Sequence, residues 1–200
     1  MYLVGGLRGA DSAAEVWRYD LDGDDWAHVL QPGNDAGADD ADPPSEPRAA
    51  PGKILALGYH DLSAKLVAVD ERAGVAKPGI GPKIARLLVF DLRTNMSRVA
   101  LTLPRVGTFD DVRLAARETG TFVLVGVQRN AKKWDAFEFS VNATGQIQWL
   151  GRATGFGLVL DEPVNTSDGL FLPVASGGVH TFVPLSEKIF VKWPAGCTKL

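Results

Sequence analysis

Residues 111–152 read DVRLAARETGTFVLVGVQRNAKKWDAFEFSVNATGQIQWLGR. Short runs of apolar and β-branched residues alternate here with polar or glycine-containing turns, a pattern typical of β-strands. The runs predict strands at Asp111–Arg117, Thr121–Gln128, Trp134–Val141 and Ile147–Arg152. Helical periodicity is almost absent. A four-stranded antiparallel sheet is therefore the expected unit.

The same unit recurs on both sides of this stretch. The preceding four strands are predicted at Lys53–Tyr59, Lys65–Asp70, Arg86–Leu92 and Ser97–Leu103. The following four are predicted at Gly157–Asp161, Gly169–Ala175, Val179–Leu185 and Lys188–Trp193. Near the N-terminus there are three, at Tyr2–Gly5, Glu15–Asp20 and Trp26–Leu30. The chain is thus expected to be all-β.

The units share a register. Tyr19, Phe90, Phe139 and Phe182 occupy equivalent positions, and the last two intervals are 49 and 43 residues. The first interval is 71 residues and falls to 50 once residues 32–52 are subtracted. A repeat of about 40–50 residues that holds four short strands indicates a β-propeller, in which each sheet buries its faces against its neighbours. A β-sandwich of similar short strands is the alternative.

Residues 32–52 interrupt the repeat. They are rich in Pro, Gly, Ala and Asp and contain no large apolar residue. Such a segment cannot bury enough surface to offset its ordering entropy, so a flexible acidic loop is expected. The predicted organisation is a partial blade at 1–31, this loop, three further blades within 53–194 and a tail at 195–200. The three blades are expected at about 53–103, 111–153 and 157–193.

Residues 1–29 resemble one kelch repeat. The pieces that carry the resemblance are MYLVGG, VWRYD and DGDDW. A strand ending in Gly5-Gly6 is followed by Tyr19 thirteen residues later and by Trp26 after seven more. The other units lack the glycine pair, so the resemblance implies a divergent kelch-like propeller. Kelch propellers usually close with more than four blades, which implies an incomplete or small propeller, or half of a homodimer formed through an open edge.

Composition excludes several classes of protein. The formal net charge is -3, which argues against a dedicated nucleic-acid binder. No apolar run is long enough to span a membrane, and the N-terminal residues do not form a signal peptide. These features leave the compartment undetermined. The single cysteine, Cys197, cannot form an internal disulfide, and His28, His60 and His180 lack metal-ligand spacing, so no cofactor is expected.

One acidic segment is a weak candidate for a metal site. Asp20, Asp22 and Asp24 stand at alternate positions, as carboxylates do at the start of a calcium loop. An EF-hand loop would need Gly where Asp25 stands and Glu where Gln31 stands. The alternative is an Asp-rich turn between two strands.

Basic residues gather in the loops that join the second and third strands of each unit. In a propeller these loops share one face with the connections between blades. Against two acids, Asp11 and Glu71, they hold seven bases: Arg8, Arg72, Lys77, Lys83, Arg129, Lys132 and Lys133. This face is expected to meet a protein or an anionic ligand.

The sequence contains no catalytic motif, so the favoured hypothesis is a non-enzymatic ligand- or protein-binding module on a kelch-like propeller. The alternative is a fragment of a carbohydrate-active propeller enzyme such as a sugar oxidase. The family resemblance would then require a cysteine joined to a tyrosine near ligating histidines. Cys197, near the C-terminus, is the only cysteine that could serve.

Overall fold

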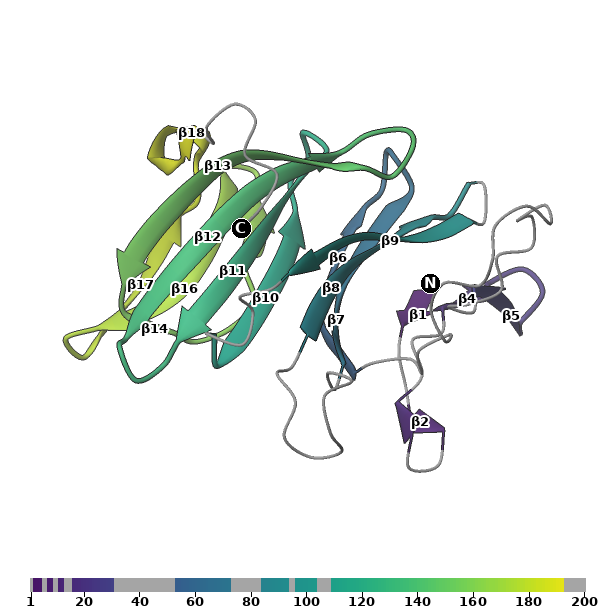
Figure 1. Ribbon diagram of the computed structural model, residues 1–200, viewed down its shortest axis with the longest axis horizontal. Helices are drawn as coiled ribbons and strands as arrows, with labels where there is room; N and C mark the ends of the chain where they lie inside the picture. Colours follow the sequence, from purple (N-terminus) through teal and green to yellow (C-terminus); the bar gives the residue numbers. More distant parts are fainter. Residues whose placement is uncertain are drawn as a thin grey trace.

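A computed structural model describes residues 2–4, 7–8, 11–12, 16–30, 53–72, 84–93, 96–103 and 109–192. Within these ranges the chain consists of antiparallel strands in several sheets and has no α-helix (Figure 1). The all-β prediction is confirmed. In the same ranges, no helix is long and apolar enough to cross a membrane.

Two four-stranded meanders form the middle of the described chain. In the upstream sheet, β6 (Lys53–His60), β7 (Lys65–Arg72), β8 (Ile84–Asp91) and β9 (Met96–Leu103) lie side by side in chain order. In the central sheet, β10 (Asp111–Ala116), β11 (Thr121–Gln128), β12 (Lys133–Val141) and β13 (Ile147–Phe156) do the same. All eight strands fall where the sequence predicts them, with small differences at their ends.

The last sheet is built around β16 (Gly169–Ser176). One edge of β16 pairs with two short strands, β14 (Leu158–Val159) and β15 (Val164–Thr166), and the other pairs with β17 (Val179–Pro184). The predicted first strand, Gly157–Asp161, is therefore shorter than expected and is continued by β15 after an interruption that contains Pro163. Proline has no N–H group to donate to a ladder, which accounts for the break.

The prediction of a fourth strand in this sheet at Lys188–Trp193 is wrong. Glu187–Ile189 forms a 3₁₀ turn, and β18 (Val191–Lys192) pairs instead with Gly151 and Arg152 at the edge of the central sheet. A Cβ atom on Gly151 would lie 2.8 Å from Cβ of Phe190 and 3.1 Å from the carbonyl oxygen of Val191. The bare glycine backbone lets the C-terminal segment approach β13, so the central sheet has five strands.

The N-terminal sheet contains three strands, as predicted: β1 (Tyr2–Val4), β4 (Val16–Asp20) and β5 (Asp25–Leu30). A small separate hairpin joins β2 (Leu7–Arg8) to β3 (Asp11–Ser12). The predicted acidic loop at 32–52 and the tail at 195–200 lie outside the described residues.

The central sheet buries both of its faces, as strand β11 shows. Phe122 and Leu124 pack in a core cluster with Val67 of the upstream sheet. The alternate residues Val123 and Val125 pack in a second cluster with Leu172 and Val174 of the last sheet. Because successive strand residues point to opposite faces, β11 must be apolar at almost every position.

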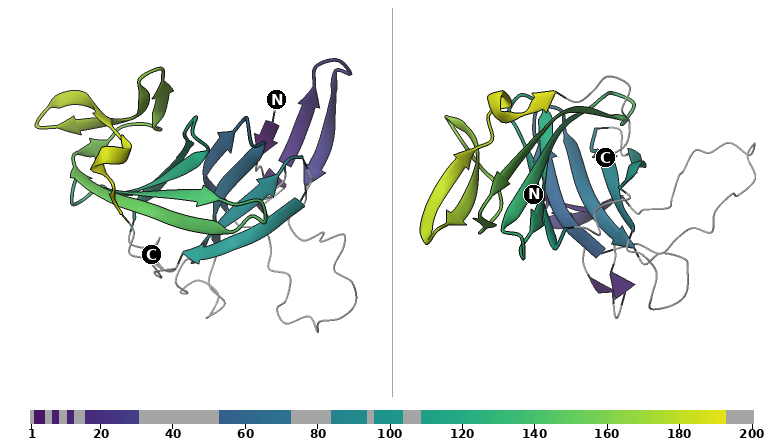
Figure 2. Two further views of the ribbon diagram at one scale, coloured as in Figure 1. Left: turned by 90° about the horizontal axis from the view of Figure 1, so that it is seen from above. Right: turned by 60° about the vertical axis from the view of Figure 1, so that its left-hand side comes forward.

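The upstream, central and last sheets therefore succeed one another face to face (Figure 2). This stacking of meanders is the packing that a propeller uses, but the described sheets do not close into a ring. What the structure establishes is a stack of antiparallel sheets with open ends.

Candidate functional site

Turns at one end of the stack border an open hollow of about 360 Å³. The turn between β11 and β12, the turn between β16 and β17 and the link from β13 to β14 all meet there, at the lower left of Figure 1. The lining residues are Ala131, Lys132, Phe156, Gly157, Leu158, Ala175, Ser176, Gly177 and Gly178. This is the end at which the sequence predicts a binding face.

Lys132 closes the β11–β12 turn. Its backbone N–H donates to the carbonyl oxygen of Arg129 at 3.1 Å, and its φ of 47° lies in the left-handed region. Ala64 and Asp24 end four-residue hairpin turns with φ values of 49° and 50°. The left-handed residue therefore belongs to this hairpin type and is not a strain peculiar to the site.

Glycines form the opposite rim of the hollow. Gly177 and Gly178 have φ values of 58° and 81°, the pair of positive angles that a type I′ hairpin turn requires. A Cβ atom on either glycine would meet no other atom within 4 Å. The absence of side chains here keeps the rim open.

The link between β13 and β14 supplies an apolar wall. Gly157 donates its N–H to the carbonyl oxygen of Lys132 at 2.6 Å, which ties the link to the β11–β12 turn. On either side of it, Phe156 is 77% exposed and Leu158 is 38% exposed. An aromatic ring left this open to water is available for contact with a partner.

Acidic residues neutralise part of the positive charge that the sequence predicts at this end of the stack. The guanidinium of Arg129 lies 2.9 Å from a carboxylate oxygen of Asp111, and its backbone N–H donates to Asp110 at 2.6 Å. The Lys133 ammonium lies 3.8 Å from Asp135. Among the ion pairs of the described residues, none includes Lys132. Positive charge at the hollow is thus concentrated on Lys132.

Two carboxyl groups near this end titrate away from their ordinary values. Burial raises the pKa of Asp111, but hydrogen bonds from Arg129 and Arg113 outweigh it and bring the pKa below the usual value. Burial raises the pKa of Glu162; the charge of Arg113, 3.2 Å away, lowers it again, but the net shift is upward. As the pH falls, Glu162 therefore takes up its proton earlier than an ordinary carboxyl group and Asp111 later.

Of the seven predicted basic residues, Lys132 is the one that lines the hollow among the residues the structure describes. Arg8 and Arg72 belong to β2 and β7, but their side chains are not described, and Lys77 and Lys83 lie outside the described residues. Conversely, Phe156 lines the hollow although the sequence analysis did not predict it as a site residue. The signal that could have found it is a phenylalanine between two glycines, Gly155 and Gly157, at the end of a strand run.

The candidate metal ligands form a hairpin turn between β4 and β5. Asp20 accepts a hydrogen bond from the N–H of Asp22 at 3.1 Å, and Asp24 accepts one from the hydroxyl of Tyr19, which raises the pKa of Tyr19. No group of three or more His, Cys, Asp or Glu side chains in the described part of the chain could hold a metal ion. The structure shows the Asp-rich turn and does not bring the three carboxylates together as a ligand set.

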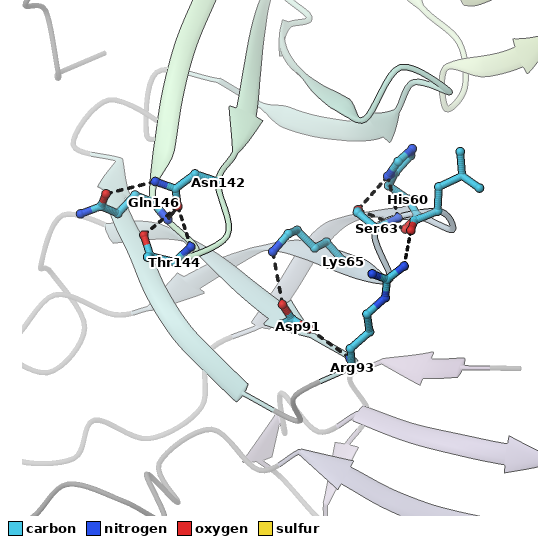
Figure 3. A network of polar contacts seen from close by, with 9 residues as sticks. His60, Ser63, Lys65, Asp91, Arg93, Asn142, Thr144 and Gln146 are labelled. Atoms are coloured by element: carbon cyan, nitrogen blue, oxygen red, sulfur yellow. Dashed lines mark hydrogen bonds and ion pairs between the residues drawn. The ribbon is translucent and has the colours of Figure 1, made fainter.

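The opposite end of the stack carries polar contacts that close turns (Figure 3). His60 is 9% exposed, with Nδ1 2.7 Å from the Ser63 hydroxyl and Nε2 3.2 Å from the carbonyl oxygen of Glu118. His60 thereby links the first turn of the upstream sheet to the first turn of the central sheet. Both of its nitrogens have partners, which identifies it as a structural histidine.

Two further networks lie at this end of the stack, one built around an ion pair and one around the side-chain amide of Asn142. The Lys65 ammonium lies 3.3 Å from Asp91, whose other carboxylate oxygen accepts the N–H of Arg93 at 3.0 Å. Asn142 accepts hydrogen bonds from the N–H groups of Thr144 and Gln146, both at 2.9 Å. These bonds fix hairpin turns.

A scan against protein-family models gives no match for this chain, and a search of curated proteins gives none. The kelch resemblance therefore rests on the residues of 1–29 alone.

Proposed function

We propose that this chain is a non-enzymatic binding module on a divergent, incomplete kelch-like propeller, and that it binds its partner at the hollow. One observation carries the proposal. An exposed phenylalanine, Phe156, lines the same hollow as Lys132, a cation without an ion pair among the described residues. Since a fold does not determine a function, the proposal depends on this site and not on the propeller-like stack.

The chemistry of the hollow selects its ligand. Phe156 and Leu158 offer apolar surface, and the ammonium of Lys132 offers hydrogen-bond donors and a positive charge. A volume of about 360 Å³ is at the small end for ligand pockets and suits a single large side chain. The partner that fits is an acidic peptide segment that carries an aromatic residue.

No observation favours the alternative of a carbohydrate-active enzyme fragment. That reading requires histidines that are free to bind a metal, and both nitrogens of His60 are engaged. His180 lies on β17, and Cys197 lies outside the described residues. The binding function accounts for the hollow without further groups.

A labelled random copolymer of glutamate and tyrosine tests the proposal by fluorescence anisotropy. We expect binding that weakens as salt is raised, because Lys132 contributes a screened charge. Lys132→Met should weaken binding about threefold to fivefold and Phe156→Ser about tenfold. Lys188→Met, which removes an exposed lysine of the 3₁₀ turn, is the matched control and should leave binding unchanged.

Polyglutamate of the same length separates charge from the apolar contact. It should bind more weakly than the copolymer, since it lacks an aromatic side chain for Phe156. Equal affinity for the two polymers, or affinity that neither site substitution alters, would contradict the proposal.

A further inference from the structure

Strand β17 of the last sheet has a neighbour on one edge only. It pairs with β16 along six residue pairs, and no strand within the described ranges pairs with its other edge. In the upstream and central sheets the third strand of the meander, β8 or β12, lies between two neighbours. The segment that the sequence predicts as the fourth strand of the last sheet pairs with β13 instead, as β18. β17 therefore has the position of a third strand and the open outer edge of a last one.

The exposure of β17 agrees with an open edge. Residues 179–182 are all exposed, and they include Val179 at 66% and Phe182 at 63%. These two side chains point to opposite faces of the sheet, because one odd-numbered and one even-numbered residue of a strand do so. On β12, by contrast, the six consecutive residues 134–139 are buried. The first part of β17 is thus accessible on both faces.

Strand register identifies which backbone groups of β17 point away from β16. A two-residue turn precedes the strand, so Ser176 and Val179 form a hydrogen-bonded pair, and such pairs alternate with non-hydrogen-bonded ones. Just beyond the strand, the N–H of Leu185 donates to the carbonyl oxygen of Leu170 at 2.8 Å, in step with that alternation. The odd-numbered residues therefore bond to β16, and the even-numbered residues direct their backbone groups outward.

The outer edge is suited to accept another strand. His180 and Phe182 each present an N–H and a carbonyl group there, and Pro184, which has no N–H, ends the row. The strand contains no Asp, Glu, Lys or Arg, and its pairing with β16 has no bulge. Charged side chains and bulges are common means by which edge strands avoid further pairing. β17 uses neither of them.

The hollow indicates which segment pairs with this edge. Gly177 and Gly178 line the hollow, and Val179, the first residue of β17, follows them directly. An extended chain advances about 3.3 Å per residue, so about four residues lead from the turn to a position beside Phe182. A peptide that occupies the hollow can therefore reach the outer edge of β17 with the residues next to its aromatic side chain.

We propose that the acidic, aromatic peptide bound at the hollow continues as an added strand on the outer edge of β17. Main-chain hydrogen bonds to His180 and Phe182 would then supply affinity, while the hollow selects the aromatic residue. This inference rests on the proposed function, because it requires a peptide at the hollow.

Two substitutions at one position separate the backbone from the side chain. His180→Pro and His180→Ala both remove the imidazole, but only the proline removes the outward N–H. Because that N–H does not bond to β16, proline is compatible with the pairing of β17. In fluorescence anisotropy with the glutamate–tyrosine copolymer, His180→Pro should bind about fivefold more weakly than His180→Ala, the matched control.

Amide exchange measured by NMR on the wild-type protein needs no variant. In the free protein the amides of His180 and Phe182 should exchange fast and those of Thr181 and Val183 slowly. Saturating copolymer should slow the first two. Amides of His180 and Phe182 that are already protected in the free protein, or that the copolymer leaves unprotected, would overturn the added strand.

The two proposals fail in different ways. Equal copolymer affinity of the two His180 variants would overturn the added strand, while weaker binding by Phe156→Ser would still support the hollow as the binding site. A wild-type protein that does not bind the copolymer would overturn both proposals.

Discussion

Asp70 and Arg86 face each other across β7 and β8, and the Asp70 residue is fully buried. A carboxylate in such a place is tolerated only when it is paired and hydrogen-bonded. Sequence alone could not find the pair, because the two residues are 16 positions apart and meet only through strand register. Their contribution is therefore a property of the folded sheet.

We expect Arg86→Met to lower the free energy of unfolding by about 3–5 kcal/mol, because it leaves the Asp70 carboxylate without its guanidinium partner. Arg129→Met is the matched control. The Arg129 side chain is 61% exposed in its ion pair with Asp111, so its loss should cost at most about 1 kcal/mol. Urea denaturation of both variants measures the two values, and equal losses would refute the distinction.

Glu162→Gln probes the raised pKa of Glu162. When a carboxyl group has a higher pKa in the folded state than in the unfolded state, its ionised form costs the folded protein free energy. That cost is present at pH values above the folded-state pKa and disappears as the pH falls through it. The variant should therefore melt above wild type at pH 7 and lose this advantage in acid. A Tm difference that grows in favour of the variant as the pH falls would contradict the assignment.

At the scale of elements, the sequence predicts strands best where both faces of a sheet are buried. The bounds of β11 are predicted to the residue, because each of its faces needs an apolar side chain and the run stops at a turn. The last strand is mispredicted because its partner is decided by contacts distant in sequence. Phe190 packs against the core shared by the central and last sheets, and Gly151 opens the edge of β13 to it.

Gly151→Ala tests that explanation. The added methyl group would collide with Phe190 and Val191, so β18 should detach from the central sheet. We expect faster hydrogen exchange over residues 187–192 and a loss of about 1–3 kcal/mol in the free energy of unfolding. Amides of β11 should keep their protection, and an unchanged exchange rate in 187–192 would show that the glycine is not required.

The candidate site could be predicted only in part. The turns at 129–132 and 177–178 follow from counting strands, because antiparallel meanders place alternate turns at the same end. The charge balance did not follow, since Asp110 and Asp111 come from the start of a different strand and pair with Arg129 in space. Loop composition therefore overestimates the unpaired positive charge of the turn at 129–133, whereas Arg8, Arg72, Lys77 and Lys83 stay a prediction.

At the scale of the whole molecule, the two ends of the stack differ in character. One end has turns closed by internal polar bonds, such as those of His60 and Asn142. The other has a hollow beside Lys132 and Phe156. Binding residues often lie on loops that a rigid scaffold positions, which is why we place the proposed site at the end with the hollow.

Hydrogen exchange measured by mass spectrometry, with and without the glutamate–tyrosine copolymer, tests the central claim most directly. The account predicts slower exchange in peptides that cover 129–133, 155–159 and 175–179, which surround the hollow. Peptides that cover the turns at 61–64 and 142–146, at the opposite end, should not change. Protection of that opposite end without protection around the hollow, or no protection at either end under saturating copolymer, would contradict the claim.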